Sequence, residues 1–300
     1  MLPPALFPPF ALPPLPGWPT MSWPPADNAA LDAVFYDVNV LEPYERKLLS
    51  KPGHDEGMVL EVGTSRAPSL RIWPGISECD NLAPSYAALS VAGVGSSGLG
   101  AAAFARNVAD AVGGPVLAVV SGFGMKDLAA EALGGFYLFG GLNAARHMAQ
   151  VFEPLTSFAP PWLQPIDPGH TMPIARRSKD VQALRELLEG RVKVPLLVGH
   201  SKGNLVISEA LYAMRERDRD GFAALAASLD VVTFGARIAM PKGLASVSDV
   251  MGDLDGFGAF NSRPDIAVDR VVPQAWHHTN TALKFHVPVT RELRRLLAAS

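Results

Sequence analysis

An apolar run at residues 192–198 sets the strongest limit on how this chain folds. Such a run is typical of a strand at the centre of a sheet that is covered on both faces. A segment with helical periodicity precedes the run at 178–189, and another helical segment follows it at 204–214. The apolar face of the first helix holds Val181, Leu184, Leu187 and Leu188. A buried strand between two helices predicts a layered α/β arrangement.

The same alternation of strands and helices recurs along the chain. We expect further strands at 58–62, 69–73, 115–120 and 230–234, and a helix at 99–112. Alternating elements of this kind build a mostly parallel central sheet flanked by helices. The sequence therefore predicts a single α/β domain over residues 55–300.

Residues 1–54 are predicted to form an N-terminal arm that is rich in proline. The first 28 residues hold ten prolines, a density that excludes helices and central strands and favours an extended conformation. We favour an arm that packs across its own domain. The alternative is contact with a hydrophobic surface or partner through the apolar side chains Phe7, Phe10, Trp18 and Trp23.

The overall composition excludes some classes of function. Hydrophobic residues make up 48% of the chain and charged residues 18%, which is enough apolar material for a folded core. A net charge of −3 gives no sign of nucleic-acid binding. The single cysteine, Cys79, excludes an intramolecular disulfide and a cysteine metal cluster. No His, Asp or Glu cluster has the spacing of metal ligands, so we expect no metal.

The N-terminal sequence does not resemble a signal peptide. No Lys or Arg precedes Arg46, and proline interrupts every apolar run in the arm. We therefore expect a cytoplasmic protein, although secretion stays an alternative. The uncharged stretch 87–105 consists mainly of Ala, Gly and Ser, so we interpret it as buried core and not as a membrane span.

The strongest functional signal is the sequence Gly199-His200-Ser201-Lys202-Gly203, a G-x-S-x-G pattern between a predicted strand and a predicted helix. In that context the pattern indicates a sharp turn that exposes a nucleophilic serine, here Ser201. Side chains at positions 199 and 203 would collide with neighbouring elements. His200 points away from the hydroxyl in this geometry and is interpreted as a packing residue.

The segments 196–205 and 231–236, the second of which contains Thr-Phe-Gly, resemble the lipase and esterase branch of the α/β-hydrolase superfamily. The chain is similar to class 3 lipases in particular, at the level of motifs, over roughly residues 110–290. The resemblance implies an α/β-hydrolase fold and a Ser-His-Asp triad that cleaves carboxylic esters, without a cofactor. Lys202 and Asn204 replace the usual Leu and Gly, which leaves the subfamily open.

The general base should follow Ser201, because the chain order of this superfamily is serine, acid, histidine. The candidates are His277, His278 and His286. We favour His278, since the resemblance places a histidine before a small residue, and we keep His277 as the alternative. His286 lies in a strand-like segment and is interpreted as structural.

The acid of the triad is predicted at Asp265. Its segment, 261–266, is similar to an Asn-x-x-Asp segment of the family. Asp269 is the alternative, and Asp253 and Asp255 are interpreted as parts of a solvated loop.

Two backbone N–H groups should stabilise the oxyanion of an acyl-transfer intermediate. One belongs to Lys202, which follows the nucleophile. We place the second in the glycine-rich segment 121–124, at Phe123 with Gly124 as the alternative, because this segment resembles the family's oxyanion loop.

Several alternatives stay open. The G-x-G-x-x-G sequence at 93–98 is also compatible with a dinucleotide-binding oxidoreductase, although no acidic residue ends the next strand. An acyltransferase or an intracellular polyester depolymerase would use the same triad, and a catalytically dead scaffold would keep the fold.

The substrate is expected to be a lipophilic ester. Residues 125–177 are longer than a strand-to-helix connection requires, and we expect them to form an inserted lid or acyl pocket. The aromatic residues of this insertion are Phe136, Tyr137, Phe139, Phe152, Phe158 and Trp162.

Overall fold

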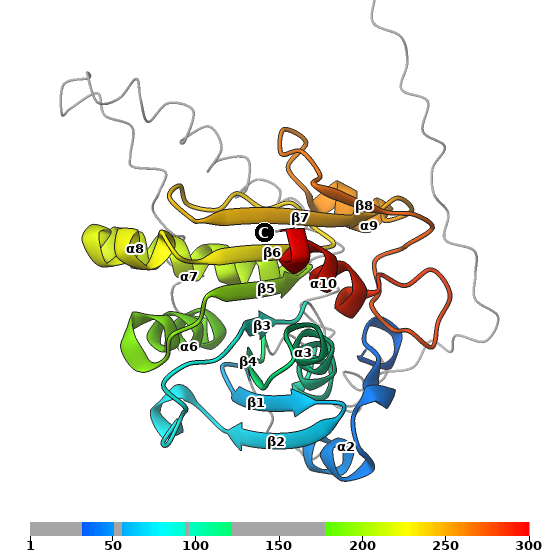
Figure 1. Cartoon of the computed structure of the whole chain (residues 1–300), viewed down its shortest axis with the longest axis horizontal. Helices are drawn as coiled ribbons and strands as arrows, with labels where there is room; N and C mark the ends of the chain where they lie inside the picture. Colours follow the sequence, from blue (N-terminus) through cyan, green and yellow to red (C-terminus); the bar gives the residue numbers. More distant parts are fainter. Residues whose placement is uncertain (1–31, 51–55, 94–95, 122–177, 300) are drawn as a thin grey trace, which may run out of the picture.

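A single twisted sheet organises the part of the chain that the computed structural model describes, namely residues 32–50, 56–93, 96–121 and 178–299. Within these ranges the sheet has eight strands in the order β2-β1-β4-β3-β5-β6-β7-β8, which run from the bottom to the top of Figure 1. The strands are β1(Val59–Thr64), β2(Ala67–Trp73), β3(Leu89–Val91), β4(Val116–Val119), β5(Leu196–His200), β6(Asp230–Phe234), β7(Ser246–Gly252) and β8(Arg270–Val272).

Helices lie on both faces of this sheet. The α-helices are α2(Pro43–Leu49), α3(Gly98–Val112), α6(Lys179–Glu186), α7(Lys202–Arg217), α8(Arg219–Ala226), α9(Gly256–Asn261) and α10(Val289–Ala299). Shorter helical turns are η1(Val38–Val40), η2(Ile76–Glu78) and η5(Leu187–Arg191).

Most strand pairs in the sheet are parallel. From β4 through β3, β5, β6 and β7 to β8, every neighbouring pair runs in the same direction. Only β1 reverses, pairing antiparallel with both β2 and β4. The prediction of a mostly parallel sheet flanked by helices is confirmed.

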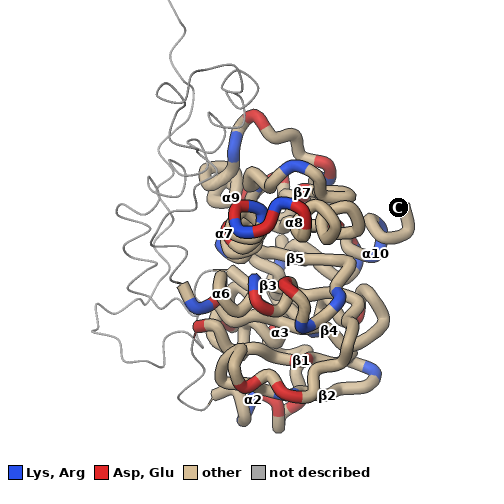
Figure 2. The backbone as a smooth tube through the Cα atoms, turned by 90° about the vertical axis from the view of Figure 1, so that its left-hand side faces the viewer, with Lys and Arg blue, Asp and Glu red and all other residues tan. Residues whose placement is uncertain are grey.

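Side chains of the central strands alternate between two hydrophobic clusters, one on each face of the sheet. In β5, Leu196 and Val198 pack into the cluster that contains Phe104 of α3 and Leu293 of α10. Leu197 points the opposite way, into the cluster formed with α6, α7 and α8. Strand β5 carries no charged residue, and charged segments lie on the surrounding helices and loops in Figure 2. The fold therefore has three layers, because both faces of these strands are apolar and need cover.

Strand β5 is shorter than the sequence indicated. We expected it to begin at Val192, but it begins at Leu196, after η5 has ended at Arg191. Lys193 instead forms an isolated bridge with Ser85. Strands β7 and β8 and helices α9 and α10 were not anticipated.

Residues 32–50, which we had assigned to an extended arm, are largely helical and pack onto the α/β domain. Tyr36, Leu41 and Leu49 belong to the same hydrophobic cluster as Phe104. Glu45 of α2 and Arg106 of α3 form an ion pair at 2.6 Å in which neither side chain is exposed. Residues 1–31 and the expected insertion at 125–177 lie outside the described residues.

The uncharged stretch that we interpreted as core supplies all of β3 and the first half of α3. Leu89, Val91, Phe104 and Ala105 are fully buried there. Across the described ranges, no helix combines the length and the apolar character that crossing a bilayer requires.

The stability of the fold should depend strongly on the Glu45–Arg106 pair. Replacing Arg106 by Met leaves the carboxylate of Glu45 buried without its cation, which costs about 3–5 kcal/mol of unfolding free energy. Urea denaturation would measure this loss. The matched control is Arg71→Met, because the Arg71–Glu61 pair is 3.8 Å long with an Arg71 side chain that is 49% exposed. We expect a loss of at most about 1 kcal/mol there. Equal losses in the two variants would contradict this dependence.

Candidate active site

Ser201 occupies the turn between β5 and α7, at the N-cap of the helix. Its backbone has φ 53° and ψ −120°, a left-handed conformation that a residue with a side chain rarely adopts. Its N–H donates to the carbonyl oxygen of Phe234 at 2.8 Å, so the end of β6 holds the turn in place. This strained conformation exposes part of Ser201 at the end of a buried strand.

The two glycines of the motif permit close approach of the elements around the turn. A Cβ atom at Gly203 would collide with the backbone carbonyl of Val91, and one at Gly199 would collide with the side chain of Asn204. This confirms that positions 199 and 203 have no room for a side chain. Asn204 donates its amide hydrogens to the carbonyls of Phe234 at 3.1 Å and Ala236 at 3.0 Å, so it ties α7 to the end of β6.

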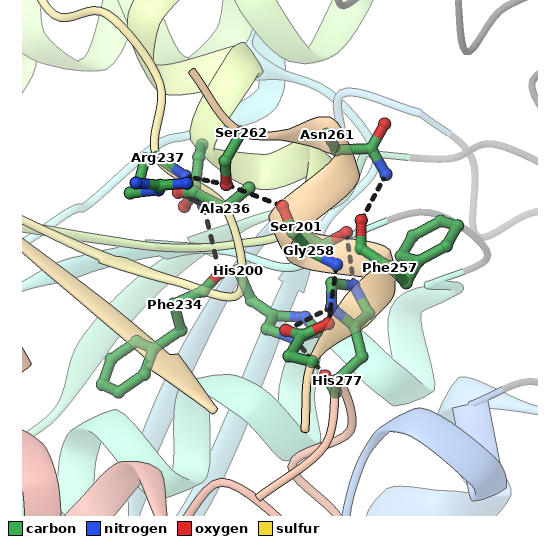
Figure 3. Close-up of polar contacts among 12 residues, drawn as sticks. His200, Ser201, Phe234, Ala236, Arg237, Phe257, Gly258, Asn261, Ser262 and His277 are labelled. Atoms are coloured by element: carbon green, nitrogen blue, oxygen red, sulfur yellow. Dashed lines mark hydrogen bonds and ion pairs between the residues drawn. The ribbon is translucent and has the colours of Figure 1, made fainter. Parts of the chain in front are cut away.

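His277 lies against the hydroxyl of Ser201, as Figure 3 shows. Its Nε2 is 2.9 Å from Ser201 Oγ, and its Nδ1 is 2.8 and 3.0 Å from the two carboxylate oxygens of Asp255. A carboxylate only accepts, so Nδ1 carries the hydrogen and Nε2 is left to accept from the serine hydroxyl. This is the tautomer that a general base needs.

Asp255 is positioned by the helix that follows it. It is the N-cap of α9, and its side chain accepts from the N–H of Gly258 at 2.6 Å. The residue is only 2% exposed. Because the carboxylate is held by both the helix N-terminus and His277, its orientation is fixed from two directions.

Aromatic rings pack around the imidazole of His277. The ring of Phe257 lies 4.8 Å from it with an edge-on orientation, and Phe35 lies 6.2 Å away, also edge-on. His277 itself is 2% exposed. The hydrogen bonds of the site therefore operate in a largely water-free environment, where they are stronger than in bulk water.

The structure does not place His278 at Ser201. Its Nε2 donates to the carbonyl oxygen of Lys284 at 3.0 Å, and burial lowers the pKa of its imidazole. Our preference for His278 is wrong in geometry, and the alternative, His277, makes the contact. The side chains of His277 and His278, although adjacent in sequence, leave the backbone in different directions, so only one of them reaches Ser201. His286 is partly buried and its Nδ1 donates to the carbonyl oxygen of Leu283 at 2.9 Å; it follows a turn and does not lie in the strand that we expected.

Neither predicted acid approaches His277. Asp265 forms an ion pair with Arg263, and its side chain is 40% exposed. Asp269 accepts a hydrogen bond from the backbone N–H of Asp249 at 2.8 Å. The placement of the acid at Asp265 is therefore wrong, as is the interpretation of Asp255 as part of a solvated loop.

Sequence reasoning missed Asp255 because it missed the elements on either side of it. Strand β7 ends three residues before Asp255, and α9 begins directly after it. The sequence does carry a signal, since an Asp followed by Gly-Phe-Gly after an apolar segment fits a helix N-cap. A carboxylate at such a junction sits at the carboxyl end of a parallel strand, the edge where sites collect.

The loop after β3 also lies against Ser201. A Cβ atom at Gly93 would come within 2.8 Å of Cβ of Ser201 and within 3.0 Å of the carbonyl oxygen of His200. Lys202, the first residue of α7, adjoins Ser201 on the other side. Phe123 and Gly124, our candidates for the second oxyanion donor, lie outside the described residues.

The N-terminus of α3 is occupied by a side chain of the protein itself. The carboxylate of Asp32 accepts from the N–H of Ser97 at 3.2 and 3.3 Å and from its hydroxyl at 2.5 Å. A dinucleotide-binding loop would offer this helix end to a pyrophosphate. The position of Asp32 therefore argues against the oxidoreductase alternative.

Two further kinds of site, a reactive thiol and a metal centre, find no support in the described ranges. Burial raises the pKa of the Cys79 thiol to about 11, so it stays protonated near neutral pH. Across those residues, no group of three or more His, Cys, Asp or Glu side chains is arranged to hold a metal ion.

Comparisons of the chain with protein-family models, curated proteins and solved structures found no match. The assignment of the site therefore depends on its own geometry.

The backbone strain at Ser201 gives a prediction that needs no substrate. Ser201→Gly should raise the unfolding free energy relative to Ser201→Ala by about 1 kcal/mol, because glycine adopts a positive φ without steric cost while alanine keeps the strain. Thermal or urea unfolding of the two variants would measure the difference. A glycine variant less stable than the alanine variant would contradict the strained turn.

Asp32 should make stability depend on pH. Burial raises the pKa of its carboxyl from 3.8 to about 7, so the folded state binds the proton more tightly than the unfolded state between these values. The contribution of Asp32 to stability should therefore fall as pH rises from 4 to 7. Urea unfolding of wild type and Asp32→Asn at pH 4.5, 6 and 7.5 would test this. The unfolding free energy of wild type should fall relative to that of the variant as the pH rises. Asp218→Asn, at the exposed N-cap of α8, is the matched control and should shift less.

Proposed function

We propose that this protein is a serine hydrolase with an α/β-hydrolase fold that cleaves carboxylic esters. The observation that carries the proposal is the continuous hydrogen-bond chain from Ser201 through His277 to Asp255. A serine hydroxyl is a weak nucleophile unless a base accepts its proton and a carboxylate orients that base. The hydroxyl, the base and the orienting carboxylate meet in these three residues.

The position of these residues in the fold supports the same conclusion. The serine occupies a sharp turn between a buried parallel strand and a helix, in a strained conformation. The acid and the histidine follow it in the chain order serine, aspartate, histidine, at 201, 255 and 277. This combination is the nucleophile elbow and triad order of α/β-hydrolases. The intact triad geometry also argues against a dead scaffold.

The proposed reaction has two halves. In the first, Oγ of Ser201 attacks the ester carbonyl while Nε2 of His277 takes its proton, and the charged imidazolium is stabilised by Asp255. The tetrahedral intermediate collapses to an acyl-serine as His277 gives the proton to the departing alcohol. In the second half, His277 takes a proton from water as the water oxygen attacks the acyl carbonyl. The bond to Oγ of Ser201 then breaks, the carboxylic acid leaves, and His277 returns the proton to Oγ.

The oxyanion of the intermediate needs preorganised N–H donors. We assign one to Lys202, the residue after the nucleophile. The closeness of the Gly93 backbone to Ser201 supports a second donor from the loop that follows β3. This loop leads from β3 into α3, which is the connection that supplies the second donor in α/β-hydrolases. Phe123 and Gly124, which we expected from the sequence, lie outside the described residues.

Apolar side chains beside the triad favour a lipophilic acyl group. Phe257 packs on His277 and is 38% exposed, and Phe260 and Leu254 in the same region are 65% and 53% exposed. Apolar surface this close to the nucleophile can bind the hydrocarbon part of an ester. A lipase or esterase therefore fits the site better than an enzyme for small polar esters.

The deciding experiment is covalent labelling with a fluorophosphonate probe, together with hydrolysis of nitrophenyl esters from acetate to palmitate. Wild type should react with the probe and hydrolyse the esters, and Ser201→Ala should do neither. The melting temperature of the variant should stay within a few degrees of that of wild type, which shows that it is folded. Longer acyl chains should be preferred if the apolar surface binds them. Failure of the folded wild type to label and to hydrolyse any of these esters would refute the proposal.

Paired variants should separate the triad from its neighbours in sequence. His277→Ala and Asp255→Asn should each lower kcat by roughly three or more orders of magnitude. The matched controls His278→Ala and Asp265→Asn should retain activity within about tenfold, since neither side chain contacts the triad. A loss in His278→Ala comparable to that in His277→Ala, at unchanged stability, would contradict the assignment of the base.

A further inference from the structure

His200, the second residue of the elbow, is fully inside the protein and makes two hydrogen bonds with its ring. Its Nδ1 lies 3.0 Å from the hydroxyl oxygen of Tyr36, and its Nε2 lies 2.9 Å from the backbone carbonyl oxygen of His277. The hydroxyl oxygen of Tyr36 in turn lies 2.6 Å from the backbone nitrogen of Gly93. We had interpreted His200 as a packing residue, but its contacts connect two parts of the site.

The directions of these hydrogen bonds follow from the groups at the two ends. The carbonyl of His277 only accepts, so Nε2 of His200 carries the hydrogen and donates to it. In a neutral imidazole Nδ1 then accepts, and it accepts from the Tyr36 hydroxyl. The oxygen of that hydroxyl remains available for the N–H of Gly93. Each donor in this series of hydrogen bonds therefore has one acceptor. No other assignment of the hydrogens satisfies all three bonds.

The surroundings keep His200 in this neutral form. Burial, with a smaller contribution from His277, lowers the pKa of His200 to about 3. The rings of Tyr36, Phe104 and His277 surround it at centroid distances of 5.5, 5.8 and 5.1 Å. A neutral imidazole keeps one hydrogen-bond donor and one acceptor in fixed positions and does not act as a base.

We propose that Tyr36 and His200 are a positioning pair, which fixes the backbone of the base His277 and the loop at Gly93 relative to the nucleophile. His200 is covalently joined to Ser201, so one rigid unit connects the nucleophile, the segment that carries the base and the loop assigned to the oxyanion. The pair touches no reacting atom and acts only through these neighbours. The inference rests on the proposed function for its kinetic consequences.

Substitutions at His200 separate hydrogen bonding from packing. His200→Leu fills the space but removes both bonds, and should lower kcat by about 10²-fold with little change in KM, since small displacements of a catalytic group have effects of this size. His200→Gln places an amide N–H near the position of Nε2 and should restore kcat to within about tenfold of wild type. His200→Asn is too short to reach His277 and should resemble the leucine variant.

Tyr36→Phe tests the other half of the pair. It removes the donor to His200 and the acceptor for Gly93, and we expect a loss in kcat similar to that of His200→Leu. The double variant should be no slower than the slower single variant, because the two residues act in series. Tyr212→Phe is the matched control, since Tyr212 is another buried tyrosine, 2% exposed, on the α7 helix. Its kcat should be unchanged.

A measurement that needs no substrate distinguishes this inference from the proposed function. In wild type and Tyr212→Phe, the Nδ1 proton of His277 should give a downfield NMR resonance that is protected by its bond to Asp255. In His200→Leu and Tyr36→Phe this resonance should broaden or disappear, whether or not the protein hydrolyses esters. Folded variants that retain the resonance, or a glutamine variant as slow as the leucine variant, would overturn the positioning role.

Discussion

The hydrogen bond between Asp255 and Nδ1 of His277 is the interaction on which the arrangement of the site depends. It fixes which ring nitrogen carries the hydrogen, and so leaves Nε2 to accept from Ser201. Asp255 can hold that position because it also caps α9. The local start of a short helix thus decides the chemistry of a histidine that lies 22 residues later in the chain.

The N-terminal segment 32–50 is part of the same construction. Asp32 accepts hydrogen bonds from Ser97, the N-cap residue of α3. Glu45 neutralises Arg106 inside the protein, and Tyr36 contacts both Gly93 and His200. These polar groups are buried, so removing one partner leaves the other unpaired and lowers the stability of the fold strongly. The segment therefore covers the α3 face of the sheet and also ties the loop after β3 to the turn that carries Ser201.

Two physical demands meet at the elbow. The turn must expose the serine, which requires a strained backbone and close packing around Gly199 and Gly203. The proposed mechanism also requires a rigid turn, because a hydroxyl that moves by an ångström loses its alignment with a base. Bonds from Ser201 and Asn204 to the end of β6 hold the turn in place, and a bond from His200 connects it to the segment of His277.

The layered α/β fold, the central strand and the turn that carries Ser201 could all be predicted from the sequence. These features depend on local periodicity and on a turn whose residues are adjacent in the chain. The folded protein, in contrast, selects His277 and not His278 as the partner of Ser201, and Asp255 and not Asp265 as the partner of His277. Their selection depends on where β7 ends, where α9 begins and which way neighbouring side chains point. Those are properties of strands and loops distant in sequence, so no local pattern specifies them.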